Sequence, residues 1–230
     1  MKFSVIIPLR SNSKGLKNKN MLNFNNNTNL TNFTLKKLIP IKEINKIYIL
    51  TDSNSYKKKI IQNKKIDKSF IRKKKYSQTN SKIQDLINDF LLSFKEEYCP
   101  ENILMLQVTS PMLKKKEILQ TLNFIKKNKT KSLFHVTKVL EHPNEIILDK
   151  NLGWKYLVKK RITNRQNYFN KYYFITGSLF FFTKKFFFKY KKLFNKKSFA
   201  YEVDKINFID IDNAFTFEMS QKLNTMKLRN

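Results

Sequence analysis

Short apolar runs alternate with segments of helical periodicity along most of the chain. Five runs are typical of buried strands, and they lie at Phe3–Leu9, Lys46–Leu50, Ser69–Arg72, Asn102–Gln107 and Lys131–Val136. Between them, apolar residues recur at helical spacing in segments 55–62, 81–94 and 114–127. The pattern closes with a predicted strand at 206–212 and a helix at 213–228, whose N-cap would be Asp212 or Asn213.

Strands that alternate with helices indicate βαβ units. We therefore predict an α/β fold with a mostly parallel sheet and helices on both faces. Sheets of this kind bind ligands at the carboxyl ends of their strands. We expect residues 1–230 to form a single domain, with an irregular excursion at about 141–172.

Composition favours a folded protein of a reducing compartment. The chain is 41% hydrophobic and 14% aromatic, which is typical of a globular domain. Its one cysteine, Cys99, excludes an intrachain disulfide. The apolar stretch after Lys2 is too short for a signal peptide, and lysines interrupt the apolar stretch 179–194. We expect a soluble, cytoplasmic protein without a membrane span.

A net charge of +30 raises the alternative of a nucleic-acid-binding protein. The lysines are spread over the whole chain, together with an excess of Asn, Ile and Phe, as a strongly biased genome would produce. Most of this charge is therefore expected on solvated faces, and a nucleic-acid partner is not the favoured interpretation. The aromatic run Phe180–Phe188 could stack on bases, but its spacing is more typical of a core or a dimer face.

The loop after the first predicted strand has the composition of a phosphate-binding site. The chain has three glycines, and their spacing excludes both the dinucleotide-binding motif G-x-G-x-x-G and the Walker motif G-x-x-x-x-G-K-[ST]. Charge in this loop comes instead from side chains, namely Arg10, Lys14, Lys17 and Lys19. Turn-forming residues between them can point backbone N–H groups at an anion, and they are Ser11, Asn12, Ser13 and Gly15.

Two carboxylates near the end of the chain are candidate metal ligands. Asp210 and Asp212 are two residues apart, so on a strand they would share one face. Such a pair suits Mg²⁺ that is also held by substrate phosphates. A simpler role for Asp212 is to cap the last helix.

The first loop also carries a family resemblance. The segment PLRSNSKGLKNKN resembles the P-A-R-x-G-S-K-x-x-x-x-K-N opening of the acylneuraminate cytidylyltransferases, which make CMP-activated sialic acids and related nonulosonic acids. Ser11 and Asn12 replace the usual Gly-Gly. Six further blocks resemble the family in the same order, and they read IYILTDS, LQVTSP, EHP, RQ, ITGSLF and IDIDNAFTFE. The resemblance implies a nucleotide-diphospho-sugar transferase-like, Rossmann-like fold.

The resemblance further implies transfer of CMP from CTP to the anomeric hydroxyl of a nonulosonic acid, with release of pyrophosphate. The implied catalytic residues are Arg10, Lys14, Lys19 and Asn20, and the implied nucleotide-binding residues are Arg10, Ser13, Lys14, Asn20 and Arg72. Sugar binding is implied for Gln107, Arg165, Thr176 and Phe180, and Mg²⁺ binding for Asp210 and Asp212. The excursion at 141–172 would cross to a partner subunit, which implies a homodimer.

Departures from the family gather on the sugar side. Thr176 stands where the family usually has asparagine, Phe180 where it often has tyrosine, and Glu145 near a common lysine. These changes indicate either a different nonulosonic acid or a catalytically impaired relative that still binds CTP. No general base can be identified from the sequence.

Overall fold

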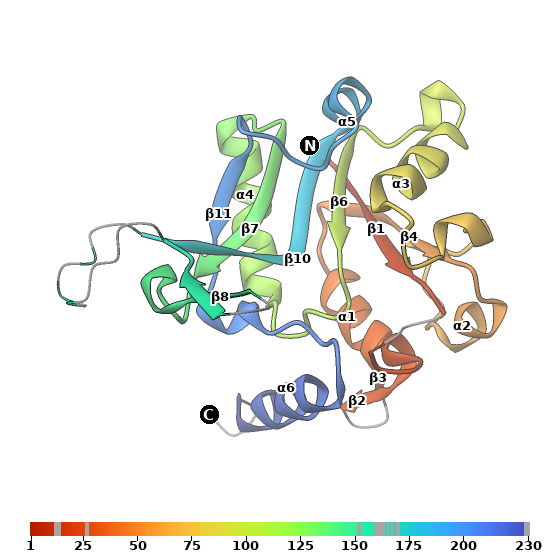
Figure 1. The fold of residues 1–230 in the computed structure, drawn as a ribbon. Helices are drawn as coiled ribbons and strands as arrows, with labels where there is room; N and C mark the ends of the chain where they lie inside the picture. Colours follow the sequence, from red (N-terminus) through yellow and green to blue (C-terminus); the bar gives the residue numbers. More distant parts are fainter. Residues whose placement is uncertain are drawn as a thin grey trace.

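The computed structural model describes residues 1–11, 15–25, 28–150, 153–158, 164, 166, 168 and 171–227. Within them, a seven-stranded sheet runs through the molecule in the order β11-β7-β10-β6-β1-β4-β5 (Figure 1). The strands are β1 (Phe3–Leu9), β4 (Ile44–Thr51), β5 (Ile66–Asp67), β6 (Asn102–Leu106), β7 (Ser132–Lys138), β10 (Tyr173–Thr183) and β11 (Phe199–Glu202). All pairings are parallel except those of β10, which runs antiparallel to both β6 and β7. The predicted α/β fold with a mostly parallel sheet is confirmed.

Helices cover both faces of this sheet because side chains of each strand alternate between two cores. In β1, Val5 and Ile7 belong to the larger core, whereas Ile6 belongs to the smaller one. The larger core takes side chains from α1 (Leu30–Leu38), α2 (Asn54–Lys59), α4 (Lys115–Asn128) and α6 (Ala214–Lys227). The smaller core takes them from α3 (Ile83–Leu92) and α5 (Lys184–Tyr190).

Two predicted strands are wrong. In place of a strand at Ser69–Arg72, β5 pairs earlier in the chain, and only Ile71 forms an isolated bridge, with Thr51. The segment 206–212 is not a strand: Lys205–Phe208 forms a 3-10 turn and the residues after it are unpaired with the sheet. The start of this segment is held by a side chain and not by strand pairing. The Glu117 carboxylate accepts hydrogen bonds from the Asp204 amide at 3.1 Å and from the Asn207 side chain at 2.9 Å.

The predicted helices are found within one to three residues of their expected ends, and α6 begins at Ala214, directly after Asn213. The Asn213 Oδ1 atom accepts a hydrogen bond from the Thr216 amide at 2.9 Å, so Asn213 is the N-cap that the sequence left open. The sequence analysis did not predict α1, β10 or β11. Within the aromatic run at 180–188, Phe181, Phe182 and Phe187 are fully buried, as expected for a core.

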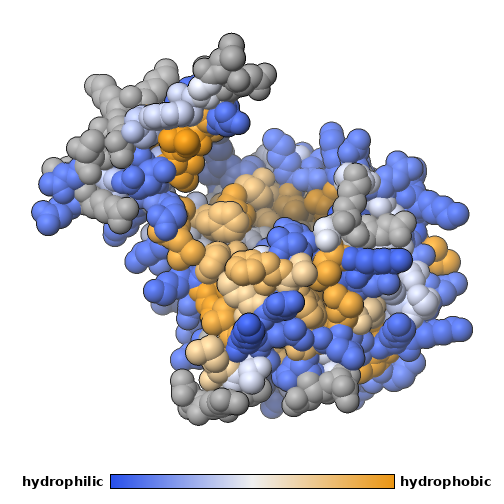
Figure 2. Space-filling view, turned by 60° about the horizontal axis from the view of Figure 1, so that its bottom comes forward, coloured by the Kyte–Doolittle hydropathy of each residue, from blue (hydrophilic) through white to orange (hydrophobic). Residues whose placement is uncertain are grey.

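An arm projects from the body of the molecule (Figures 1 and 2). It contains the hairpin β8 (Ile147–Lys150) and β9 (Gly153–Tyr156) and the first part of β10. Large apolar side chains are exposed on it, and they include Ile147, Trp154, Tyr173, Phe174 and Ile175. A second small hairpin joins β2 (Asn23–Asn25) to β3 (Thr28–Asn29) near α6. Of the helices described, none combines the length and apolar character needed to cross a membrane.

Candidate active site

A polar cavity of about 280 Å³ opens at the carboxyl ends of the central strands. Arg10 directly follows β1, Gln107 directly follows β6, and Arg72 follows the bridge to β4. The cavity lies at the point where the strand order continues from β1 to β4 on one side and to β6 on the other. Ligands of doubly wound sheets bind at such a position.

Seven of the residues that the sequence analysis assigned to binding or catalysis line this one cavity. They are Arg10, Lys19, Asn20, Arg72, Gln107, Asp210 and Asp212. They come from four segments that are far apart in the chain, so their convergence is a property of the fold. Ser13, Lys14 and Arg165, which the resemblance also implied, lie outside the described residues.

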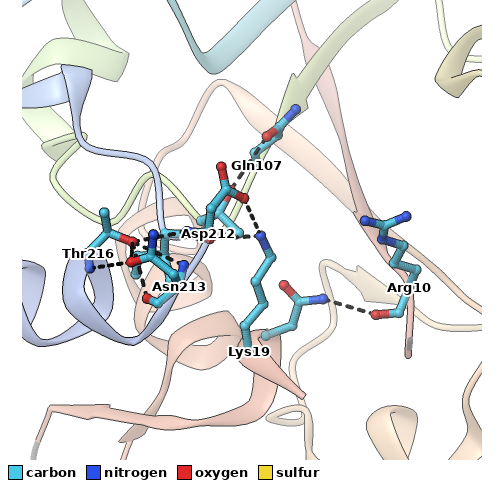
Figure 3. Close-up of polar contacts among 9 residues, drawn as sticks. Arg10, Lys19, Gln107, Asp212, Asn213 and Thr216 are labelled. Atoms are coloured by element: carbon cyan, nitrogen blue, oxygen red, sulfur yellow. Dashed lines mark hydrogen bonds and ion pairs between the residues drawn. The ribbon is translucent and has the colours of Figure 1, made fainter. Parts of the chain in front are cut away.

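Lys19 joins the first loop to the end of the chain. Its Nζ atom donates hydrogen bonds to the Ile211 carbonyl oxygen at 2.7 Å and to Oδ1 of Asp212 at 2.8 Å (Figure 3). Gly15 packs against the same segment, because a Cβ atom on it would fall well inside van der Waals distance of the Asp212 carbonyl oxygen. Contact between the two segments thus depends on an ammonium group at one position and on the absence of a side chain at the other.

Asn20 and Asp52 hold the first loop from within. The buried Asn20 side chain donates to the Arg10 carbonyl at 3.2 Å, and the backbone carbonyl of Asn20 accepts from the Thr31 hydroxyl at 2.8 Å. The Asp52 carboxylate accepts hydrogen bonds from the amide and hydroxyl of Ser11, at 2.9 and 3.1 Å. The Arg10 guanidinium makes no hydrogen bond with any described residue and lines the cavity, which leaves it available to an anion (Figure 3).

Arg72 is 7% exposed and is fixed by the loop that follows it. Its Nε atom donates to the Tyr76 carbonyl at 3.1 Å, and the Ser81 hydroxyl donates to the same oxygen at 2.7 Å. Burial lowers the pKa of Arg72, while the negative charge of Asp52 opposes that shift. A guanidinium is protonated at any physiological pH, so a fixed positive charge lies at the cavity wall.

The two aspartates differ in their surroundings. Oδ1 of Asp210 is buried without a hydrogen-bond partner among the described residues, whereas the side chain of Asp212 is 72% exposed and pairs with Lys19. Burial raises the pKa of Asp210, and the nearby charge of Asp212 adds to this, while a hydrogen bond from Thr109 opposes it. An unsatisfied carboxylate oxygen is costly, and a bound cation would satisfy it.

A metal at this position would need ligands from outside the protein. Within the described ranges, no group of three or more His, Cys, Asp or Glu side chains is arranged to hold a metal ion. Asp210 and Asp212 supply two hard oxygen ligands from one segment. Mg²⁺ is commonly bound by one or two carboxylates plus substrate phosphates and water, so the residues present fit Mg²⁺ bound together with a nucleotide.

Of the four residues expected at the sugar, the structure describes Gln107, Thr176 and Phe180, and it places them in different surroundings. Gln107 lines the cavity, and a Cβ atom on Gly177 would lie 3.8 Å from Oε1 of Gln107. Thr176 is buried and hydrogen-bonds to the Ser178 hydroxyl at 2.8 Å, so it does not line the cavity. Phe180 stacks on Phe194 in the smaller core. Neither Thr176 nor Phe180 lines this cavity, and the sugar-binding roles implied for them stay predictions.

Sequence reasoning did not single out Gln78, Ser81 or Asp52 as site residues. Gln78 and Ser81 line the cavity, and Asp52 holds its first loop. Asp52 carried a usable signal, because it follows a predicted strand directly. Gln78 and Ser81 lie in an irregular loop whose position is set by tertiary contacts, so no pattern in their local sequence indicates that they line a cavity.

Comparison with known proteins adds a family and a set of relatives. The family model described as "Cytidylyltransferase" matches residues 4–227. Two relatives are named N-acylneuraminate cytidylyltransferase. The protein of Streptococcus agalactiae serotype V is 26% identical over 220 residues, covering 94% of this chain and 52% of the relative. The protein of Escherichia coli O18:K1:H7 is 27% identical over 234 residues, covering 99% and 54%.

This chain thus spans about half the length of the curated relatives it matches. Solved structures share its fold at low identity. A CMP:2-keto-3-deoxy-manno-octonic acid synthetase complexed with CTP has a TM-score of 0.69 at 12% identity, covering 99% of this chain and 100% of that one. The 4-diphosphocytidyl-2C-methyl-D-erythritol synthase of Anaerococcus prevotii has a TM-score of 0.67 at 14% identity, covering 97% and 96%.

Proposed function

The chain belongs to the cytidylyltransferase family, and from this premise we propose that it transfers CMP from CTP to the anomeric hydroxyl of a sialic acid-like nonulosonic acid. The observation that carries the proposal is the convergence of Arg10, Lys19, Arg72, Asp210 and Asp212 on one cavity at the carboxyl ends of the strands. This set combines positive charge for a triphosphate with carboxylates for a cation. The names of the relatives, N-acylneuraminate cytidylyltransferase, support the choice of sugar.

The charges of the cavity suit a nucleoside triphosphate. Arg10 can grip phosphate oxygens with two parallel hydrogen bonds, and Lys19 provides a point charge beside them. During transfer, the sugar hydroxyl oxygen forms a bond to the α-phosphorus and the bond from that phosphorus to the pyrophosphate oxygen breaks. The hydroxyl proton passes to solvent. Negative charge grows on the departing pyrophosphate, where fixed cations lower the barrier.

Asp210 and Asp212 would hold Mg²⁺. The ion would supply charge neutralisation at the phosphates when bound. Lys19 keeps Asp212 beside the first loop, and burial keeps Asp210 short of hydrogen-bond partners. Two carboxylates fill only a part of the coordination sphere of Mg²⁺. We therefore expect the ion to bind when the phosphates of the nucleotide supply further ligands.

The apolar arm supports assembly as a homodimer. Trp154 is 58% exposed and Ile147 is 51% exposed on the β8–β9 hairpin. Figure 2 shows hydrophobic atoms both on the arm and on the body next to it. Exposed apolar surface of this kind is typical of an interface. A second copy of the chain that covers the arm would lie beside the first residues of β10, which belong to the arm.

The test is pyrophosphate release from purified protein with Mg²⁺, CTP and a panel of nonulosonic acids, with ATP, GTP and UTP as controls. The proposal expects release that requires CTP and one of the sugars, and that is lost in Asp212→Ala but kept in Glu218→Gln, an exposed carboxylate of α6. CTP that raises the melting temperature without any release would favour an impaired nucleotide-binding relative. No effect of CTP at all would contradict the proposal.

A further inference from the structure

A second cavity, of about 460 Å³, lies at the opposite end of the sheet. It forms where β6 and β7 begin and where β10 ends, beside α5. Figure 1 shows α5 at the top of the molecule and α6, next to the candidate active site, at the bottom. The two cavities share no lining residue, so the second one needs an explanation of its own.

Five lysines converge on this second cavity from three separate segments. Lys129 and Lys131 belong to the turn before β7, Lys185 and Lys189 to α5, and Lys197 to the loop before β11. The one acidic lining residue, Glu101, lies 3.9 Å from Lys184, which is outside the cavity. None of the five lysines forms an ion pair with a described residue. The one lining carboxylate does not balance five cations, and a bound anion would relieve their mutual repulsion.

Aromatic rings complete the lining. Phe186 is buried, whereas Tyr190 and Phe199 are 39% and 47% exposed. Phe186 packs on Tyr190 with ring centroids 4.9 Å apart, and Phe199 packs on Phe124 at 5.5 Å, so both exposed rings are supported from behind. The Lys189 ammonium lies over the Tyr190 ring, 5.4 Å from its centroid. Phe199, which is nearly half exposed and packs on Phe124, is therefore the ring that favours stacking of a planar group.

The backbone around the cavity is held by local hydrogen bonds. Lys129 ends α4 in the left-handed conformation, with φ 46°. The side chain of Asn195 accepts from the Lys197 amide at 2.9 Å, and the hydroxyls of Ser132 and Ser198 are hydrogen-bonded to each other. These contacts fix the places from which the lysines extend. A fixed frame reduces the ordering cost of binding.

We propose that this cavity is a second ligand site, which takes a nucleoside phosphate. The base would stack on Phe199, and the phosphates would lie among the lysines. The volume falls within the range of about 300–1000 Å³ that small-molecule sites occupy. A concave pocket with one positive rim fits a single nucleotide better than it fits a strand, whose backbone needs an extended groove. This site is independent of the proposed transferase activity.

The test uses ATP with an N-methylanthraniloyl fluorophore as the binding probe and 8-azido-ATP as the photolabel. Both are applied to Arg72→Ala protein, in which the candidate active site is weakened. The cavity variant is Lys131→Ala/Lys189→Ala, and the matched control is Lys58→Ala/Lys59→Ala, which removes two exposed lysines from α2. We expect about tenfold weaker probe binding in the cavity variant only. The photolabel should map to peptides within residues 129–132 or 183–199.

Equal binding in the cavity variant and its control would overturn the proposal, as would photolabel confined to the peptides that contain Arg10 or Asp210. Single-stranded DNA that competes at far lower concentration than ATP would overturn the choice of a small molecule. Melting temperatures of both double variants should match the parent, because all four lysines are at the surface and without ion pairs among the described residues. If the wild-type protein released no pyrophosphate, the proposed transferase function would be contradicted, but the binding result at this cavity would still stand. The two proposals can therefore be refuted independently.

Discussion

The ammonium group of Lys19 lies 2.8 Å from Oδ1 of Asp212, across 193 positions of sequence. The same ammonium also donates to the Ile211 carbonyl. A cation of the first loop and a carboxylate of the closing segment thus fix each other at the mouth of the candidate active site. Both residues line the cavity, so a phosphate and a metal ion could bind beside this pair.

Lys19→Gln is expected to lower kcat/KM about a hundredfold, because it removes a fixed charge from the site of phosphoryl transfer. The melting temperature should change little, since a pair with one exposed partner contributes about 0–1 kcal/mol. Initial rates and calorimetry measure the two effects. Lys17→Gln, at an exposed lysine of the same loop, serves as the control, and an equal loss of rate in that variant would contradict a specific role for Lys19.

Gly15→Ala is expected to displace the Asp212 backbone, because the new methyl group would overlap the Asp212 carbonyl oxygen. Overpacking of this kind costs about 1–3 kcal/mol. Chemical denaturation gives the free energy of unfolding, and the effect of CTP on the melting temperature reports the site. Lys17→Ala alters the same loop without this overlap. A Gly15→Ala protein as stable and as active as the parent would mean that the two segments do not pack closely in solution.

Asp210→Asn is expected to stabilise the metal-free protein and to abolish transfer. An amide buried in place of a carboxylate avoids the cost of desolvating a charge, but it is a poor ligand for Mg²⁺. Calorimetry with and without Mg²⁺ and CTP should show a raised melting temperature and no further rise on adding Mg²⁺. Glu218→Gln should retain the parental response. Mg²⁺-dependent stabilisation that survives in Asp210→Asn would remove Asp210 from the metal site.

Arg72→Lys is expected to raise the KM for CTP about tenfold while changing kcat less. Lysine keeps the charge but loses the planar group that donates to the Tyr76 carbonyl, so the charge is no longer held at the wall of the cavity. Steady-state kinetics over a range of CTP concentrations separates the two constants. Lys74→Ala, on the neighbouring turn, is the control, and a fall in kcat alone would place Arg72 at the reaction step.

His135 gives the protein a pH-dependent stability. Burial lowers its pKa from 6.5 to about 3, and its ring is hydrogen-bonded to Thr121 and Ser178. Between about pH 3 and pH 6.5, His135 is therefore protonated in the unfolded chain and neutral in the folded chain. The stabilisation is complete above pH 6.5 and decreases as the pH falls toward 3.

The free energy of unfolding should consequently be about 1.4 kcal/mol lower at pH 5.5 than at pH 7.5. Denaturation at the two pH values measures this difference, which His135→Gln should reduce and His142→Gln should retain. Proton resonances of the His135 ring provide a second measurement on unmodified protein. A ring that titrates near pH 6 in the folded state would show that it is not buried as described.

The site was more predictable from the sequence than the elements that carry it. Arg10 and Gln107 follow compact apolar runs, and such runs identify both a strand and its carboxyl end. Asp210 and Asp212 lie beside the first loop, but the strand expected to present them is a 3-10 turn followed by residues that do not pair with the sheet. Glu117, 87 residues earlier, holds that segment by hydrogen bonds to Asp204 and Asn207, and a contact of such range leaves no periodic pattern.

The missed elements have a similar cause. Helix α1 contains Thr31, Asn32 and Thr34, which are weak helix formers, and its stability comes from burial of Leu30, Leu35 and Leu38. Strand β10 turns through Gly177 at φ 70°, which breaks its alternation between Ile175 and Phe180. Its direction depends on its neighbours β6 and β7, and the sequence of β10 alone does not encode that choice.

The position of β10 also sets the order in which the chain can fold. It lies between β6 and β7, although it follows both in sequence. As the chain leaves the ribosome, β6 and β7 expose unpaired edges until residues 173–183 have been made, and β7 keeps a second unpaired edge until β11 has been made. Unpaired edges are prone to association with other chains. Synthesis of this protein therefore includes an interval of vulnerability to aggregation, which covers at least the 45 positions from the end of β7 at Lys138 to the end of β10 at Thr183. Chaperones that bind extended strands would have their main effect in this interval.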